Sequence, residues 1–290
     1  MPCVWTPESP SPRLADTVNL ADAATLRAFL QRHGAWARKG LGQHFLCSAK
    51  AVEGIVSRCM GCAGVLEIGP GPGVLTSPLS LFARVVALEV DDAMIEALRE
   101  SAPDADVRRV DALKADLSAV LSELPAPRAV VSNLPYYITG PLLTAISGAR
   151  RSFDRAVLMM QKEVGARVVA TAGSSERGSL SVFLQAQFSI SKVLDVPAGA
   201  FFPPPKVDSI VLEFVPLDAH PGEELLTFVR TGFTQPRKTL ANNLATGLGV
   251  PREAVHGWLA AAALPERVRA QELDLEAWER LFAQKPKNPA

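Results

Sequence analysis

The sequence has no excess of charge of either sign, and it has few cysteines. Its 30 lysine and arginine residues balance its 30 aspartate and glutamate residues. No overall positive field therefore attracts nucleic acid, and any contact with nucleic acid must depend on local clusters. Of the four cysteines, only Cys59 and Cys62 are close together. A closed structural zinc site needs four ligands, and no second pair or histidine cluster lies nearby. We therefore expect reduced thiols and no metal.

Long apolar runs are also absent. No segment reaches the length that spans a membrane, and the first residues lack a basic start followed by an apolar core, so we expect a cytoplasmic protein without a membrane partner. A chain of 290 residues with 48% hydrophobic content can bury a large core that divides once. We expect a disordered extension over residues 1–20, a first domain over 21–216 and a second over 217–290, in a protein that acts as a monomer.

Short apolar runs alternate with helical patterns through the first domain, and helical patterns fill the second. This predicts an α/β fold, with a Rossmann-like, mostly parallel sheet covered by helices on both faces and a small C-terminal all-helical domain. Strands are expected near residues 64–69, 84–90, 106–110, 128–133, 155–160, 186–194 and 207–215. Helices are expected in the second domain at 225–233, 237–244, 252–262 and 275–283. This second domain either forms one wall of an RNA cleft or only shields the sheet.

A glycine-rich turn follows the first expected strand, where Gly69, Gly71 and Gly73 alternate with Pro70 and Pro72. Glycines remove Cβ atoms where a cofactor must touch backbone, and they adopt positive φ at little cost. The spacing differs from the dinucleotide fingerprint. This difference argues against a ligand that contains a pyrophosphate. An ordinary loop is the alternative.

Acidic residues end the next two expected strands. Glu89 follows the first glycine by 20 positions, from 69 to 89, which is the offset of a ribose-binding acid. Asp91 and Asp92 are better interpreted as a turn and N-cap for a helix over 93–100. Asp111, followed by Ala112, is placed to accept a hydrogen bond from a cofactor's adenine amine, although alone it would be interpreted as a loop acid.

The most informative segment is Asn133-Leu134-Pro135-Tyr136, at the carboxyl end of a further expected strand. The Asn133 side-chain oxygen and the Leu134 carbonyl could accept both hydrogens of an adenine amine and favour a nitrogen ready for attack. Pro135 stiffens the turn and lacks a competing donor. Tyr136 offers a ring for stacking on an extruded base. These groups indicate a nucleic-acid methyltransferase. The alternative is that the segment is only a turn at the end of a strand, with a buried tyrosine.

Taken together, these motifs resemble the ribosomal RNA adenine dimethyltransferase family, in particular its bacterial small-subunit (16S-type) members. The resemblance extends over nearly the whole chain. It is carried by residues 41–46, 67–71, 89, 111–112, 133–136, 161–164, 178–181, 202–209, 237–240 and 242–243.

The resemblance implies a class I methyltransferase fold that uses S-adenosylmethionine as methyl donor and releases S-adenosylhomocysteine. The methyl groups are expected to go to two adjacent adenosines near the 3′ end of 16S rRNA, in the small ribosomal subunit, late in its biogenesis. Neither a metal nor a DNA partner is expected. The expected catalytic residues are Asn133, Leu134, Pro135 and Tyr136. The expected cofactor-binding residues are Gln43, His44, Leu46, Gly69, Gly71, Glu89, Asp111, Ala112 and Asn133. Basic residues that include Arg237 and Lys238 are expected to contact RNA phosphates.

Four features depart from the family pattern. His44 stands where asparagine is commoner, Tyr137 where a small polar residue is usual, and Arg177 where an aromatic residue is frequent. Pro236 and Ala241 replace basic or polar residues around Arg237 and Lys238. Two other functions remain open: a resistance-type enzyme that methylates large-subunit (23S) rRNA, and a ribosome-assembly factor whose catalytic role is secondary.

Overall fold

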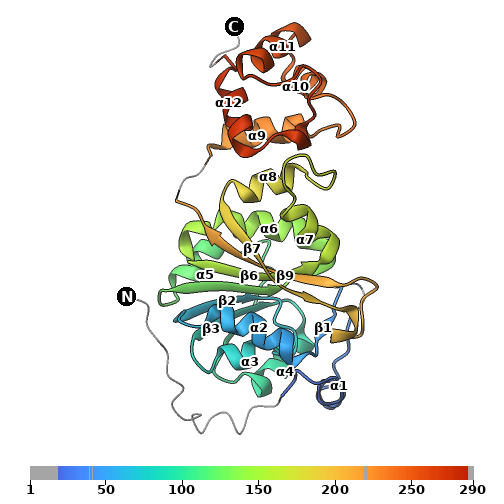
Figure 1. The fold of residues 1–290 in the computed structure, drawn as a ribbon. Helices are drawn as coiled ribbons and strands as arrows, with labels where there is room; N and C mark the ends of the chain where they lie inside the picture. The colour runs from blue at the N-terminus through green and yellow to red at the C-terminus, as the bar shows by residue number, and fades with distance from the viewer. Residues whose placement is uncertain (1–18, 39, 41, 219–220, 287–290) are drawn as a thin grey trace. The chain divides into compact units, whose positions relative to one another are not determined.

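The computed structural model describes residues 19–38, 40, 42–218 and 221–286 (Figure 1). Nearly all of the expected N-terminal extension lies outside these residues. The chain folds into two compact units, the first formed by 1–159 with 193–211 and the second by 160–192 with 212–290. The expected division after residue 216 differs from this grouping and stays a prediction.

A seven-stranded sheet in the order β4-β3-β2-β5-β6-β9-β7 forms the centre of the fold. The five strands from β4 to β6 are parallel neighbours. The amide of Leu217 donates to the carbonyl of Gln187 (2.9 Å), which places the end of β9 beside the start of β7, so these two strands run antiparallel. The strands are β2 (Gly64–Ile68), β3 (Arg84–Glu89), β4 (Asp106–Arg109), β5 (Arg128–Asn133), β6 (Arg155–Gln161), β7 (Phe188–Val196) and β9 (Ser209–Pro216).

The register of the parallel strands aligns their carboxyl ends. Ile68 of β2 pairs with Leu88 of β3 and with Ser132 of β5. The next residue of each strand is therefore at the same level of the sheet, and these residues are Gly69, Glu89 and Asn133. Parallel pairing thus brings three separate sequence motifs to one edge, which is where open α/β sheets bind ligands.

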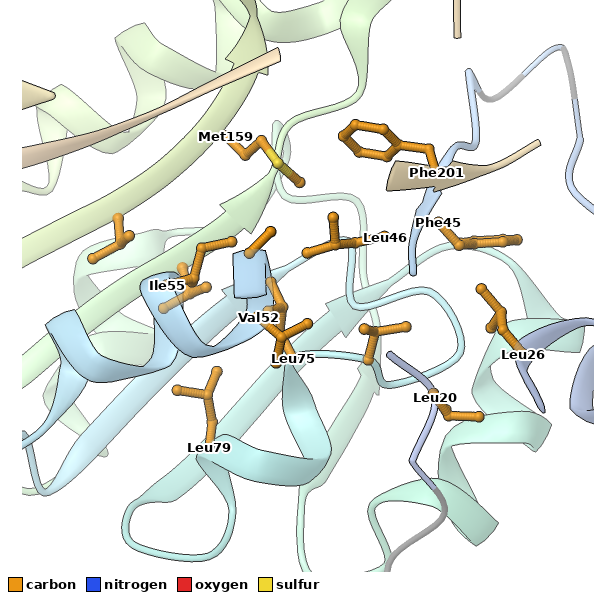
Figure 2. Packing of buried hydrophobic residues seen from close by; sticks show 14 of the residues in the cluster. Leu20, Leu26, Phe45, Leu46, Val52, Ile55, Leu75, Leu79, Met159 and Phe201 are labelled. Atoms are coloured by element: carbon orange, nitrogen blue, oxygen red, sulfur yellow. The ribbon is translucent and has the colours of Figure 1, made fainter. Parts of the chain in front are cut away.

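Helices cover both faces of the sheet (Figure 1). On one face, Val65, Val85 and Ala129 belong to the same core cluster as the apolar sides of α1, α2, α3 and α4. Figure 2 shows part of this cluster, with Val52 and Ile55 of α2 beside Leu46 and Leu75. The alternate strand residues Leu66, Val86 and Val130 are also buried, so the opposite face is covered too. The helices of the first unit are α1 (Ala23–Arg32), α2 (Ala49–Cys59), α3 (Thr76–Leu79), α4 (Asp92–Ser101), α5 (Leu117–Ser122) and α6 (Thr139–Gly148).

A core cluster of the second unit contains Trp278, which is fully buried, and apolar residues of α8 to α12. The rings of Trp278 and Phe228 pack edge to face, with their centroids 6.0 Å apart. A Cβ on Gly232 would lie 2.4 Å from the same ring, so this helix contact needs a glycine. The helices are α7 (Lys162–Val168), α8 (Ser179–Gln185), α9 (Glu223–Gly232), α10 (Leu240–Leu248), α11 (Arg252–Ala261) and α12 (Leu275–Ala283).

The structure confirms the predicted α/β sheet and the C-terminal helices, and it corrects some boundaries. The expected helix over 237–244 begins only at Leu240, because the Thr239 side chain caps its N-terminus by accepting from the amide of Asn242. The helix expected over 93–100 begins at Asp92, with Asp91 alone as its N-cap. Two short strands, β1 (Phe45–Leu46) and β8 (Phe201–Phe202), were missed because a two-residue pair has no periodicity to read. Among the described residues, no helix is both long and apolar enough to cross a membrane.

Candidate active site

A cavity of about 370 Å³ lies at the carboxyl ends of β2, β3, β4 and β5, within the first unit. Its volume is in the range of small-molecule sites, about 300–1,000 Å³. Most of the residues predicted from the sequence to bind cofactor or act in catalysis line it. They are Gln43, His44, Gly69, Gly71, Glu89, Asp111, Ala112, Asn133, Leu134, Pro135 and Tyr136.

Leu46 is the predicted cofactor residue that the cavity does not include. It belongs to β1, is buried in the core, and lines a separate hollow of about 30 Å³ that also touches Glu67 and Asn133. Arg237 and Lys238 are exposed in the second unit, in the turn before α10.

The glycine turn forms the floor of the cavity. Gly69 and Gly71 both have positive φ, 68° and 57°, a conformation that favours glycine. A Cβ on Gly69 would have no protein atom within 4 Å, whereas a Cβ on Gly71 would lie 2.9 Å from the Phe45 ring. The backbone at Gly69 is therefore open to a ligand, and Gly71 lets the turn pack against β1.

Glu89 is buried at the edge of the cavity and is held by backbone amides. Its carboxylate accepts hydrogen bonds from the amides of Gly71 (3.0 Å), Val90 (2.8 Å) and Asp91 (2.9 Å). Burial raises the pKa of the Glu89 carboxyl, and these three bonds oppose the rise. A carboxylate has about four lone-pair positions, so three backbone donors leave one for a hydroxyl of a ligand.

Glu67 is the second buried acid near the turn. It is 2% exposed, and its Oε2 has no hydrogen-bond partner among the described residues. Burial raises the pKa of Glu67 to about 8, and the nearby Glu89 adds to the rise. Glu67 is therefore largely protonated at neutral pH.

Asp111 lies at the far end of the cavity, after β4. Its Oδ1 accepts from the amide of Leu113 (3.0 Å), and its Oδ2 lies 3.6 Å from the Lys114 ammonium. Two large apolar side chains beside the acids, Val90 (46% exposed) and Leu113 (39% exposed), also line the cavity. Exposed apolar groups flanking a polar site are suited to a flat aromatic ligand. We call Gly69, Gly71, Glu89 and Asp111 the carboxylate half of the cavity.

Gln43 lines the cavity, but its side chain is engaged with the protein. Its Oε1 accepts from the amide of Arg38 (2.8 Å), and its Nε2 donates to Asp91 Oδ2 (3.0 Å). The Arg38 guanidinium also lies 3.4 Å from Asp91. Asp91 therefore caps α4 and also anchors the segment that leads to His44, a second role that the sequence did not reveal.

Asn133 is oriented by a distant part of the chain. Its Nδ2 donates to the His44 carbonyl (2.9 Å). Because a carbonyl can only accept, this bond fixes which end of the amide faces His44, and the Asn133 Oδ1 has no hydrogen-bond donor among the residues that the structure describes. The adjacent Leu134 is fixed by its amide, which donates to the Met159 carbonyl on β6 (2.9 Å).

Tyr136 is held at both its hydroxyl and its ring. The hydroxyl lies 2.8 Å from the Ser209 hydroxyl, and the ring stacks on the His44 imidazole with centroids 5.5 Å apart and planes inclined by 25°. His44 Nδ1 lies 2.7 Å from the Pro203 carbonyl and so carries a hydrogen. Burial raises the pKa of Tyr136, so its hydroxyl is neutral at physiological pH. We call residues 133–136, with His44 and Ser209, the Asn-Tyr half of the cavity.

The sequence profile described as ribosomal RNA adenine dimethylase matches residues 34–283. The chain belongs to this family. It is 41% identical over 261 residues to the ribosomal RNA small subunit methyltransferase A of Geobacter sulfurreducens, covering 86% of this chain and 95% of that protein. It is 37% identical to the protein of the same name in Staphylococcus aureus, covering 95% of this chain and 99% of the relative. The family predicted from the motifs is thereby confirmed.

Solved structures agree with the fold of this dimethylase family member. A dimethyladenosine transferase from Plasmodium falciparum superposes with a TM-score of 0.68 at 26% identity, covering 83% of this chain and 97% of that one. The 23S rRNA methyltransferase ErmE gives a TM-score of 0.63 at 26% identity, covering 83% and 98%. Both support the predicted methyltransferase sheet. In the described part of the chain, no group of three His, Cys, Asp or Glu side chains is placed to hold a metal ion.

Residues 202–209 were identified as part of the family pattern, but the sequence did not predict that this segment supports the site from a distance. Ser209 and Pro203 hold Tyr136 and His44, but they lie 73 and 159 positions from their partners. Val90 and Leu113 had a usable signal, since each is an apolar residue within two positions of a strand-ending acid that was itself recognised.

Proposed function

We propose that this protein transfers methyl groups from S-adenosylmethionine to the exocyclic amines of two adjacent adenosines near the 3′ end of 16S rRNA, in the cytoplasm, late in assembly of the small ribosomal subunit. The observation that carries the proposal is the arrangement of Asn133 and Tyr136. The free Asn133 Oδ1 and the fixed Tyr136 ring belong to the same cavity as the glycine turn and Glu89. An adenine and a nucleoside-bearing donor can therefore meet in one cavity.

The carboxylate half fits the proposed donor. A Cβ at Gly69 would point into open space, so the backbone there can be approached closely. Glu89 keeps one acceptor position for a ribose hydroxyl, and Asp111 is placed for an adenine amine between the apolar Val90 and Leu113. When bound, S-adenosylmethionine supplies an electrophilic methyl group on a sulfonium sulfur.

The Asn-Tyr half fits the target base. The Asn133 Oδ1 and the Leu134 carbonyl would accept the two hydrogens of the adenine amine. His44 covers one face of the Tyr136 ring, and the adenine would stack on the other face. Catalysis then depends mainly on positioning. The amine becomes far more acidic once it carries the methyl group, so it loses its proton to solvent and needs no dedicated general base.

Two methylations of one amine require the pocket to hold that nitrogen in position twice. After the first transfer the nitrogen has one hydrogen left, so only one of the two acceptors can still be used. The Asn133 amide is anchored through its nitrogen to His44, and no described residue donates a hydrogen bond to its oxygen that would have to be displaced. The pocket must then admit the first methyl group beside the remaining hydrogen bond.

The rRNA substrate is proposed from the relatives. The proteins that are 41% and 37% identical over most of their length carry the name small subunit methyltransferase A. The structural likeness to ErmE keeps 23S rRNA as the second candidate. The test is incubation of labelled donor with undermethylated small and large subunits, followed by mapping of dimethyladenosine. Label in adjacent adenosines near the 3′ end of 16S rRNA supports the proposal, and label confined to 23S rRNA overturns it.

RNA affinity is proposed to come partly from Arg237 and Lys238. Both are exposed, and no ion pair to either is found among the described residues. By contrast, Arg32 pairs with Glu100, and Arg38 pairs with Asp91, so these basic residues are balanced locally. Replacing Arg237 and Lys238 together by alanine should weaken subunit binding and lower the slope of log affinity against log salt by up to about 2. An unchanged slope would make the pair an ordinary solvated surface.

A further inference from the structure

Tyr137 is an exposed aromatic residue on the rim of the cavity. It lines the cavity, yet it is 58% exposed, so core packing does not account for its ring. Large aromatic side chains at the edge of a ligand site supply a broad apolar surface at low entropic cost, and bases of single-stranded RNA stack on them.

The position of the Tyr137 ring is defined by the backbone beneath it. A Cβ on Gly42 would lie 3.2 Å from Tyr137 Cδ1 and 3.7 Å from its Cε1, and Gly42 has a φ of +60°. The ring therefore rests on the bare backbone at Gly42. That contact supports one side of the ring and leaves the rest of it to solvent.

Tyr136 and Tyr137 point in different directions because of the helix that carries them. They are consecutive residues of the 3₁₀ helix η3 (Tyr136–Ile138). With three residues per turn, consecutive side chains diverge by about 120°. Tyr136 is turned inward to the Ser209 hydroxyl, and Tyr137 is turned outward. One base cannot stack on both rings, so the pair presents two separate platforms.

The strand order places Tyr137 away from the acids of the carboxylate half. Tyr136 and Tyr137 follow β5, which is separated from β3 by β2, and from β4 by β2 and β3. At about 4.8 Å per strand, Glu89 is roughly 10 Å from the level of β5, and Asp111 is farther. A ligand held by Glu89 and Asp111 through its nucleoside thus occupies the opposite end of the cavity.

We propose that Tyr137 is a second base-stacking site, which holds the nucleobase next to the target adenine in the RNA strand. The inference rests on the proposed function for the identity of the RNA, and it adds a subsite to that function. Tyr136 holds the base that receives the methyl group. Tyr137 holds its neighbour, so that the strand is splayed at the rim and the target base alone enters the cavity.

The test compares Tyr137→Ala with Tyr137→Phe, which keeps the ring and serves as the matched control. With undermethylated small subunits, Tyr137→Ala should raise KM between about fivefold and 160-fold, the scale of one lost base–aromatic stack, while kcat changes little. Calorimetry should show the same affinity for S-adenosylmethionine in both variants and the parent. Tyr137→Phe should have the parental KM.

A second readout needs no methyl transfer. A short single-stranded RNA carries 2-aminopurine beside one adenosine, and its fluorescence is recorded at saturating protein with S-adenosylhomocysteine present. Parent and Tyr137→Phe should quench the 2-aminopurine by stacking, and Tyr137→Ala should not. Equal quenching in all three proteins would overturn the proposal, as would a donor affinity that falls with KM, which would make Tyr137 a wall of the donor site. A parent protein inactive on subunits would refute the proposed function, while the fluorescence would still decide the subsite.

Discussion

The two halves of the cavity are held in place in different ways. In the carboxylate half, Glu89 is fixed by backbone amides that are 1, 2 and 18 positions away in sequence. In the Asn-Tyr half, Asn133 is bound to a residue 89 positions away and Tyr136 to one 73 positions away. The first half is organised by its own loops. The second forms only when distant segments have docked.

This difference separates binding from reaction. Local backbone contacts close short loops at low entropic cost, so the carboxylate half can hold a nucleoside independently of the acceptor residues. The Asn-Tyr half depends on His44, on Ser209 and, through His44, on Pro203. Changes there should impair methyl transfer more than donor affinity.

The largest effect is expected for Asn133→Ala. The change removes the acceptor for the target amine and also the bond to the His44 carbonyl. We expect single-turnover methyl transfer to fall by about 10²-fold or more, the scale for loss of one preorganised hydrogen-bonding group. Subunit binding should persist, because phosphate contacts carry most of the affinity for nucleic acid. A folded variant with a parental transfer rate would remove Asn133 from the reaction.

Glu67→Gln tests the buried acid beneath the glycine turn. Glu67 has a raised pKa of about 8 in the folded protein against an ordinary value of 4.5. The folded state therefore binds this proton more tightly than the unfolded state, and the free energy of unfolding falls as pH rises from 4.5 to about 8. The glutamine variant should match the parent below this window and exceed its stability above it, by on the order of 5 kcal/mol for a shift from 4.5 to about 8.

Denaturant titrations of the two proteins across this pH range provide the measurement. Glu89 also has a raised pKa and is present in both proteins, so the difference between them reports the titration of Glu67 together with its charge coupling to Glu89. A stability difference that does not vary with pH would show that Glu67 does not titrate in this window.

Glu89→Ala should weaken the carboxylate half. The variant loses the acceptor for a ribose hydroxyl and releases the amides of Gly71, Val90 and Asp91. We expect donor binding to lose about 1–3 kcal/mol, as for hydrogen bonds to a charged group. Calorimetry with S-adenosylmethionine measures this loss, and Tyr136→Ala is the comparison from the other half. Unchanged affinity in a folded Glu89→Ala protein would contradict the assigned role.

Local patterns in the sequence predicted most of the sheet and the carboxylate half. Gly69, Glu89 and Asp111 each follow an apolar strand, and parallel pairing then brings strand ends together whatever the intervening helices do. Each of the seven expected strands is present, with ends shifted by at most two residues. These features depend on residues that are close together in the sequence, and the spacing of apolar residues along the chain reveals them.

The support of the Asn-Tyr half could not be predicted in this way. The contact between Tyr136 and Ser209, and the one between His44 and Pro203, depend on where the segment after β7 docks. The strands β1 and β8 that align these segments are two residues long. Leu46 could not be placed from the sequence for the same reason. It lies in the core cluster because β1 pairs with β8, and the motif of residues 41–46 does not reveal this pairing.

Tyr136→Ala, with Tyr136→Phe as the matched control, tests the separation of the two halves most directly. Donor affinity and the single-turnover rate on undermethylated small subunits are measured on the same preparations. The alanine variant loses a stacking contact of about 1–3 kcal/mol and should transfer methyl groups correspondingly more slowly, with donor affinity close to that of the parent. The phenylalanine variant keeps the ring, loses only the bond to Ser209, and should remain near the parental rate. A folded Tyr136→Ala protein that dimethylates subunits at the parental rate would contradict the account.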